Sequence, residues 1–224
     1  MRPTTVHERA RRLRYVNRGP ANNLCRYWQC YCSVACLWFV FPNPYYLRKS
    51  NINTDTDVIH GDIKPQNVLV FKDGTGKTIF KMADFGYSTL AAGEATILLP
   101  KSRPWNAPEH HFGEFEVAAA KKTDMYSFGM LCLWILFRGA PIPQNTTQFT
   151  FEASAGPRTL LEQLKDDDKV EYITNQLIES VALADLNTER RIRRKEFFSL
   201  TVPLNPDKRT SDVGRLLGLL CQKQ

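Results

Sequence analysis

Four polar residues in the stretch VIHGDIKPQNVLVF, residues 58–71, have types and spacing that suit phosphoryl transfer. They are His60, Asp62, Lys64 and Asn67. In one interpretation they belong to an ordinary loop that leads into a strand. In the other, Asp62 is a general base that accepts a hydroxyl proton, and Asn67 is an oxygen ligand of a metal ion.

A β-hairpin is predicted directly after this loop. The segments NVLVF (67–71) and TIFKM (78–82) are rich in strand-forming residues, and KDGTGK between them contains an Asp-Gly turn signal. Because the two ends of a hairpin are neighbours in space, Asn67 at its entry and Asp84 at its exit should converge, with Asp62 one short loop away. Two carboxylates and an amide suit Mg²⁺, which takes oxygen ligands and shares them with substrate phosphates. The alternative makes Asp84 a plain turn residue.

Three motifs in a fixed order resemble the C-terminal lobe of eukaryotic protein kinases. They are H-x-D-x-x-x-x-N from residue 60, D-F-G at 84–86 and A-P-E at 107–109. The resemblance implies that Asp62 is the catalytic base and that Lys64 meets the transferring phosphate. It also implies that Asn67 and Asp84 hold Mg²⁺. Structural or activation-segment roles are implied for His60, Phe85, Gly86, Ser102, Trp105, Ala107, Pro108, Glu109, Asp124 and Arg209.

The implied structural roles are specific. Phe85 would pack beneath the metal ligands, and segment 84–109 would be the activation segment. Ser102 and Trp105 fall where the family usually has Thr and Tyr in the loop that seats the acceptor peptide. The carboxylate of Asp124 would bond the backbone of the catalytic loop.

Two features downstream extend the resemblance to about residue 221. The stretch TDMYSFGMLCLWILFRG, residues 123–139, is apolar almost all round, which predicts a buried helix capped by its leading Thr-Asp and by Gly139. Arg209 matches the family's arginine that pairs with the A-P-E glutamate, here Glu109. We therefore expect a largely buried ion pair between two residues far apart in the sequence.

The predicted fold class is α+β, mainly α. Residues 58–221 are expected to form a protein kinase-like C-terminal lobe with one short hairpin. Residues 1–57 are expected to be an atypical, poorly ordered segment with no recognisable domain. At 224 residues, with 43% hydrophobic and 24% charged residues, the chain has the size and composition of one globular domain.

Charge is distributed unevenly along the chain. Residues 1–50 hold nine Lys/Arg against one acid, whereas the remainder holds 21 basic and 22 acidic groups. The body is thus nearly neutral, and no nucleic-acid partner is expected. Residues 27–47 are uncharged and long enough to span a membrane, but the Pro42-Asn43-Pro44 break argues against a span. The cysteines match neither a zinc site nor a disulfide scaffold, so reduced thiols and a cytoplasmic location are expected.

Gly61 departs from the family pattern, because many kinases carry Arg between the His and the Asp of this motif. That Arg normally pairs with a phosphorylated activation loop, so control by such a phosphate is not expected here. The His-Gly-Asp form also occurs in small-molecule phosphotransferases of the aminoglycoside and choline kinase type. Lys64 and the A-P-E motif at 107–109 are not expected in those enzymes, so the protein kinase interpretation is preferred.

A larger departure lies upstream of the catalytic loop. Kinases hold ATP with a Gly-rich loop, a strand lysine and a helix glutamate. Residues 1–59 contain one glycine, Gly19, and one lysine, Lys49, with no glutamate after it. The sequence therefore predicts that the ATP-binding residues of the N-terminal lobe are absent through truncation or mis-assembly. Binding of ATP and Mg²⁺ by this chain alone should be weak or absent, and its kinase activity negligible. The alternatives are a non-catalytic kinase-like module that binds protein partners and a membrane-anchored form of either.

Overall fold

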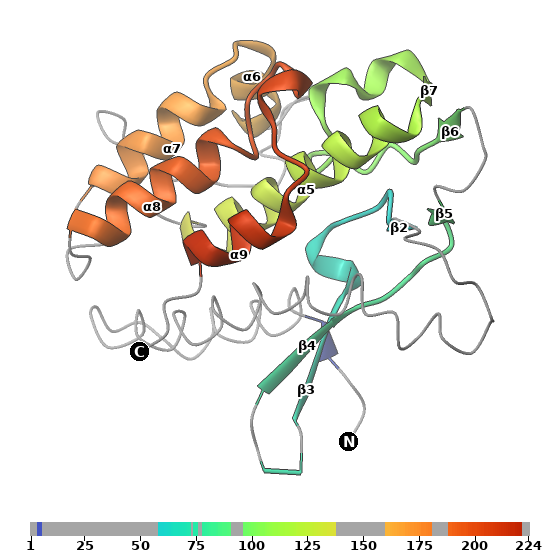
Figure 1. Cartoon of the computed structure of the whole chain (residues 1–224), viewed down its shortest axis with the longest axis horizontal. Coiled ribbons are helices and arrows are strands. Elements are labelled where there is room, and N and C mark those ends of the chain that lie inside the picture. The colour runs from blue at the N-terminus through green and yellow to red at the C-terminus, as the bar shows by residue number, and fades with distance from the viewer. Residues whose placement is uncertain are drawn as a thin grey trace.

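A group of helices and a projecting hairpin make up the computed structural model of the protein (Figure 1). It describes residues 4–5, 58–72, 74–75, 78–90, 96–137, 160–180 and 188–220. Most of the predicted N-terminal segment 1–57, including the uncharged stretch 27–47, lies outside the described residues, as does Cys221. Among the described helices, none is both long and apolar enough for a membrane crossing.

The predicted hairpin is confirmed. Strands β3 (Val68–Lys72) and β4 (Thr78–Met82) pair antiparallel, with Val68 opposite Met82 and Val70 opposite Phe80. These four side chains are buried in the main core, because alternate strand residues share one face. A third strand was not predicted: β1 (Thr4–Thr5) pairs with β3 and completes a sheet of order β1-β3-β4.

Two shorter strand pairs frame the rest of the lobe. Strand β2 (Val58–Ile59), which leads into the candidate catalytic loop at 60–67, pairs antiparallel with β5 (Thr89–Leu90), which follows the D-F-G motif. Strand β6 (Ile97–Leu98) pairs antiparallel with β7 (Glu114–Phe115), which follows A-P-E. These pairings bring the two ends of each intervening segment together.

Helix α5 (Val117–Phe137) is the centre of the core. Every residue from Thr123 to Ile135 is buried, as its all-round apolar pattern predicts. The predicted N-cap is wrong, because the helix begins six residues before Thr123 and runs through the strong helix formers at 118–120. Inside the helix, the Thr123 hydroxyl donates to the Ala120 carbonyl. The predicted C-cap, Gly139, lies outside the described residues.

Within the described residues, four further α-helices pack around α5. They are α6 (Leu160–Asp166), α7 (Val170–Glu179), α8 (Thr188–Ser199) and α9 (Val213–Leu220), and α8 lies between α7 and α9 (Figure 1). Short 3-10 turns occur at Pro65–Asn67 (η1), Pro108–Phe112 (η2) and Pro206–Lys208 (η4). The Phe128 ring of α5 meets Phe197 of α8 edge-on, with ring centroids 5.9 Å apart. Cys132 is a buried free thiol, and burial raises the pKa of that thiol.

Candidate active site

One buried carboxylate of α5 holds the loop at 60–64 through hydrogen bonds. The backbone N–H groups of His60 and Gly61 donate to the two oxygens of Asp124, at 2.7 and 3.0 Å. Burial raises the pKa of Asp124 to about 7, while these two donors favour its charged form. The structure thus contains the contact that the resemblance implied for Asp124, and it sets the loop against the centre of the lobe.

Gly61 suits the sharp turn of this loop. Its φ is +77°, and a Cβ there would lie 3.0 Å from Leu99 Cδ2. Next to it, His60 Nδ1 accepts from the N–H of Asp62 at 3.2 Å, and His60 Nε2 lies 3.2 Å from the Ala83 carbonyl. Burial lowers the pKa of His60, with the Ala83 carbonyl acting in the opposite direction. The imidazole therefore joins the catalytic loop to the segment that carries Asp84.

Asp62, Lys64 and Asn67 form one polar cluster. The Asn67 side-chain amide donates to the Asp62 carbonyl at 2.8 Å and to Asp62 Oδ2 at 3.0 Å. Lys64 Nζ lies 2.6 Å from the same Oδ2. The remaining oxygen, Asp62 Oδ1, is buried and accepts no hydrogen bond from the described residues. A buried acceptor without a donor is uncommon, and at a candidate general base it marks where a substrate donor could lie.

The hairpin brings the D-F-G segment to this cluster. The N–H of Ala83 donates to the Asn67 carbonyl at 2.8 Å, which joins the exit of β4 to the entry of β3. The next residue, Asp84, is exposed and has a φ of +64°, a left-handed conformation uncommon for a non-glycine residue. Convergence of the Asp84 carboxylate with Asp62 on one cleft stays a prediction.

Phe85 and Gly86 complete that motif. Phe85 was expected to pack beneath the metal ligands, but its side chain is 49% exposed. Its ring lies 5.0 Å from the His60 ring, so the described residues contact it on that face and leave much of its surface exposed. Gly86 is exposed, and a Cβ there would lie 3.3 Å from Asp84 Oδ1.

The loop before A-P-E lies against the same cluster. Lys64 Nζ donates to the Ser102 hydroxyl at 3.2 Å, so Ser102 is joined through Lys64 to Asp62. Trp105 is buried, and its ring meets Trp134 of α5 edge-on at 6.1 Å. The two residues that the resemblance placed in the acceptor loop therefore have different environments. Ser102 contacts the catalytic loop, whereas Trp105 anchors its own loop in the core.

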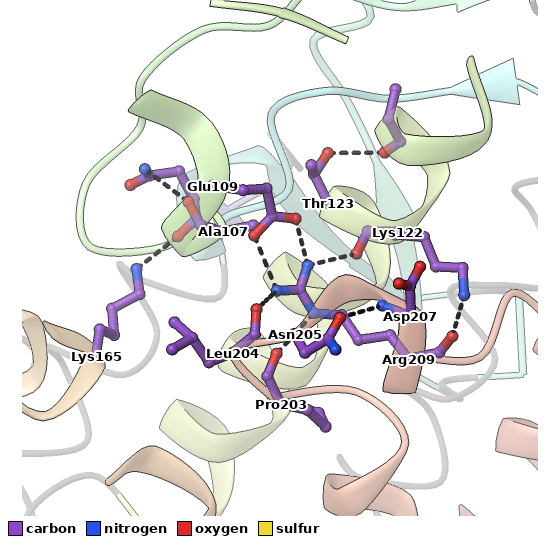
Figure 2. Close-up of polar contacts among 12 residues, drawn as sticks. Ala107, Glu109, Lys122, Thr123, Lys165, Pro203, Leu204, Asn205, Asp207 and Arg209 are labelled. Atoms are coloured by element: carbon purple, nitrogen blue, oxygen red, sulfur yellow. Dashed lines mark hydrogen bonds and ion pairs between the residues drawn. The ribbon is translucent and has the colours of Figure 1, made fainter. Parts of the chain in front are cut away.

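The predicted pair of Glu109 and Arg209 is present (Figure 2). The two terminal guanidinium nitrogens donate to the carboxylate, one of them at 2.8 Å, and the arginine side chain is fully buried. Glu109 lies in η2, which Pro108 begins and Ala107 precedes with extended backbone. Arg209 also donates to the carbonyls of Pro203, Leu204 and Lys122, at 2.8, 2.8 and 3.3 Å.

One residue near the acceptor loop was missed from the sequence. Lys165 of α6 is buried, and its ammonium group donates to the carbonyls of Pro104 and Asn106. A signal was available, since Lys165 follows the buried Leu161 by four residues and so lies on the same face of α6. No metal-ligating group of three or more His, Cys, Asp or Glu residues occurs within the described part of the chain. The Mg²⁺ ligands predicted here include an amide, Asn67.

Comparison with known proteins agrees with this geometry. The protein kinase domain profile matches residues 51–212, most of the chain. This chain belongs to the protein kinase domain family. It is 34% identical to Aurora kinase A-B of Xenopus laevis over 94 residues, which are 42% of this chain and 21% of that protein. It is 39% identical to cyclin-dependent kinase-like 2 of Pongo abelii over 88 residues, 38% of this chain and 16% of that protein.

A guanylyl cyclase is also among the relatives. Over 105 residues, 47% of this chain and 8% of that protein, the chain is 32% identical to guanylyl cyclase C of Cavia porcellus. The matched segments thus span about a fifth or less of each of these relatives. Use of ATP and Mg²⁺ and action on protein substrates are general features of the kinase family.

Proposed function

We propose that this kinase domain supports ATP-dependent phosphoryl transfer to serine or threonine of a protein substrate, with Asp62 as the base. The observation that carries the proposal is Asp62 Oδ1, which is buried and accepts no hydrogen bond from the described residues. An acceptor hydroxyl there would satisfy that oxygen and deliver its proton to it. The hydroxyl oxygen would then bond to phosphorus as the bond to the ADP leaving group breaks.

Lys64 is suited to stabilise the transferring group. Its ammonium group contacts both Asp62 Oδ2, on the proposed base, and the Ser102 hydroxyl. A positive charge held there stabilises negative charge that develops on an adjacent phosphoryl group. The Ser102 hydroxyl beside Lys64 supports an acceptor that carries an alcohol group, serine or threonine.

Asn67 and Asp84 are the proposed metal ligands. Since the Asn67 amide nitrogen is occupied by Asp62, its amide oxygen is the atom suited to a cation. Asp84 supplies an exposed carboxylate one residue beyond the backbone bond between Ala83 and Asn67. An amide oxygen and a carboxylate fit Mg²⁺, which when bound would bridge and neutralise nucleotide phosphates.

Transfer by this chain alone should be very slow. Residues 1–59 contain neither a Gly-rich loop nor a lysine followed by a glutamate, the residues that hold the nucleotide phosphates in the family. Loss of one preorganised electrostatic contact typically costs about 10²–10³ in rate. The chain should act efficiently only when a kinase N-terminal lobe supplies these residues, and it should need no activation-loop phosphate because Gly61 replaces the arginine that would bind it.

The test measures transfer of labelled γ-phosphate to a generic Ser/Thr substrate. Four proteins are compared: this chain, its Asp62→Asn variant, and both after fusion to a kinase N-terminal lobe placed before residue 58. We expect equal background for the two unfused chains and transfer in the fusion that disappears with Asp62→Asn. A folded fusion without Asp62-dependent transfer would refute the proposal. Robust Asp62-dependent transfer by the unfused chain would refute the expected inactivity.

A second function, protein binding without catalysis, is favoured by a different observation. Phe85 and Tyr87, beside the catalytic loop, are 49% and 53% exposed. Exposed aromatic side chains are common anchors of protein interfaces. If this function holds, Phe85→Ser with Tyr87→Ser should abolish partner binding, whereas Asp62→Asn should leave it unchanged.

A further inference from the structure

Lys165 is a charged residue whose burial is energetically unfavourable. Its side chain lies in α6, only 7% of the residue is exposed, and Nζ lies 2.5 Å from both the Pro104 and Asn106 carbonyls. Burial lowers the pKa of Lys165 to about 8, although the carboxylates of Glu162, Asp166 and Glu109 act in the opposite direction and Arg103 acts with burial. Lysine is rarely buried unless its charge is matched, and here two backbone carbonyls receive it.

These carbonyls belong to the loop between Ser102 and Glu109. A second contact docks α6 on this loop, because Glu162, one turn before Lys165, lies 3.9 Å from the guanidinium of Arg103. Residues three apart on a helix share one face, so α6 presents both side chains to the loop together. Figure 2 shows Lys165 reaching from its helix to the backbone beside Ala107.

The far end of the same loop is held by Arg209. Arg209 forms the bidentate pair with Glu109, and its guanidinium lies 4.7 Å from the centre of the Tyr126 ring. Lys165 Nζ lies 5.3 Å from the centre of that ring. Both cations thus contact the buried Tyr126 of α5, and the loop is fixed at two points against one side chain.

The loop connects Lys165 to the catalytic cluster. The N–H groups of Trp105 and Asn106 donate to the Ser102 carbonyl at 2.9 and 3.1 Å. Ser102 in turn accepts from Lys64, which contacts Asp62. A bonded path therefore runs from Lys165 through residues 104–106 to Ser102 and the base.

We propose that Lys165 is a positioning residue for the acceptor: it fixes the backbone of residues 104–106 and thereby sets Ser102 and the acceptor-seating surface relative to Asp62. The acceptor part of this inference rests on the function proposed above. The positioning part does not, because it concerns the loop alone. Loss of the ammonium group releases two carbonyls, so the loop should open locally while the helices remain folded.

The first measurement is amide hydrogen exchange in the full chain. In Lys165→Met, the amides of Trp105 and Asn106 should exchange at least about tenfold faster, the factor expected for losing one hydrogen bond to a charged group. Amides within α8 should exchange as in the unmodified chain. The matched control is Lys169→Met, which removes a lysine with a 56% exposed side chain paired to the exposed Asp167. Unchanged protection of Trp105 and Asn106 in a folded Lys165→Met would overturn the proposal. Lys165→Gln, a neutral donor, is the second variant if the first does not fold, and its loop amides should also exchange faster.

The second measurement separates positioning from simple stability. In the fused protein with Asp62-dependent transfer, Lys165→Met should raise KM for the acceptor peptide about tenfold and leave KM for ATP unchanged. A role in stability alone would lower kcat through loss of folded enzyme and leave both KM values unchanged, which would overturn the acceptor part. Absence of Asp62-dependent transfer before any change at Lys165 would instead refute the proposed function, and hydrogen exchange would still decide whether Lys165 fixes the loop.

Discussion

Replacing Arg209 by alanine should lower the free energy of unfolding by about 3–5 kcal/mol, the usual cost of removing one partner of a buried ion pair. The substitution leaves the Glu109 carboxylate, whose side chain is only 14% exposed, without its bidentate partner. It also removes the donors to the carbonyls of Pro203, Leu204 and Lys122. For a chain of this size the loss corresponds to a decrease in Tm of roughly 6–20 °C.

Glu109→Gln should cost less than Arg209→Ala. In Glu109→Gln, the Arg209 guanidinium would keep its three backbone acceptors and its contact with the Tyr126 ring. In Arg209→Ala, the Glu109 carboxylate would lose its bidentate partner and gain no comparable one. In a double-mutant cycle the two substitutions should be coupled by about 0.5–3 kcal/mol, as residues in one buried network usually are.

Urea unfolding followed by circular dichroism measures these differences. The control is Arg193→Ala, which breaks the pair with Glu189 on the surface of α8, where the side chains are 35% and 58% exposed. That change should cost less than about 1 kcal/mol. If Arg209→Ala and Arg193→Ala had the same small effect, the pair would not be a stabilising contact of the lobe, and the reasoning from burial would be wrong.

Three further results are expected from the packing and charges of the lobe. Gly129→Ala should destabilise the protein by about 1–3 kcal/mol in urea unfolding, because its Cβ would lie 2.6 Å from Thr201 Oγ1, and equal or greater stability would contradict this packing. Gly61→Ala should cost about 1–2 kcal/mol for the left-handed backbone, measured in the same way, and a change below about 0.5 kcal/mol would contradict the strain at this turn. Between pH 8 and 10.5 the unfolded chain binds more protons at Lys165 than the folded chain does, so the free energy of unfolding should rise with pH. Relative to Lys165→Met, the rise should be on the order of 3 kcal/mol. Parallel pH profiles of the two proteins would contradict the lowered pKa.

The sequence could predict features that depend on local spacing. Two short runs of strand-forming residues on either side of an Asp-Gly turn predict the β3–β4 hairpin, because turn and strand preferences are local. The largely apolar run after Thr123 predicts a buried helix, because a helix that is apolar on all faces must be covered on all faces. The Glu109–Arg209 pair was also predicted, although no local rule connects two residues a hundred positions apart; the resemblance to the kinase family supplied it.

The tertiary structure decided the rest. The Thr-Asp pair does not cap α5: the helix begins at Val117, and the carboxylate of Asp124 instead accepts from the backbone of His60 and Gly61. Thr4 and Thr5 favour extended backbone, but two residues are too short a run to predict a strand, and β1 is defined by its pairing with β3.

Lys165 and Asp62 show the physical reason for this division most clearly. A lysine is ordinarily exposed even near the apolar face of a helix, and packing of α6 against residues 104–106 makes Lys165 a buried donor. The sequence gives Asp62 its chemical type and its spacing from Asn67. That one of its oxygens is bonded while the other is buried and accepts no hydrogen bond from the described residues follows from the position of neighbours distant in the chain. Side-chain periodicity is a property of the local backbone, whereas desolvation and pairing of a charge depend on every element that surrounds it.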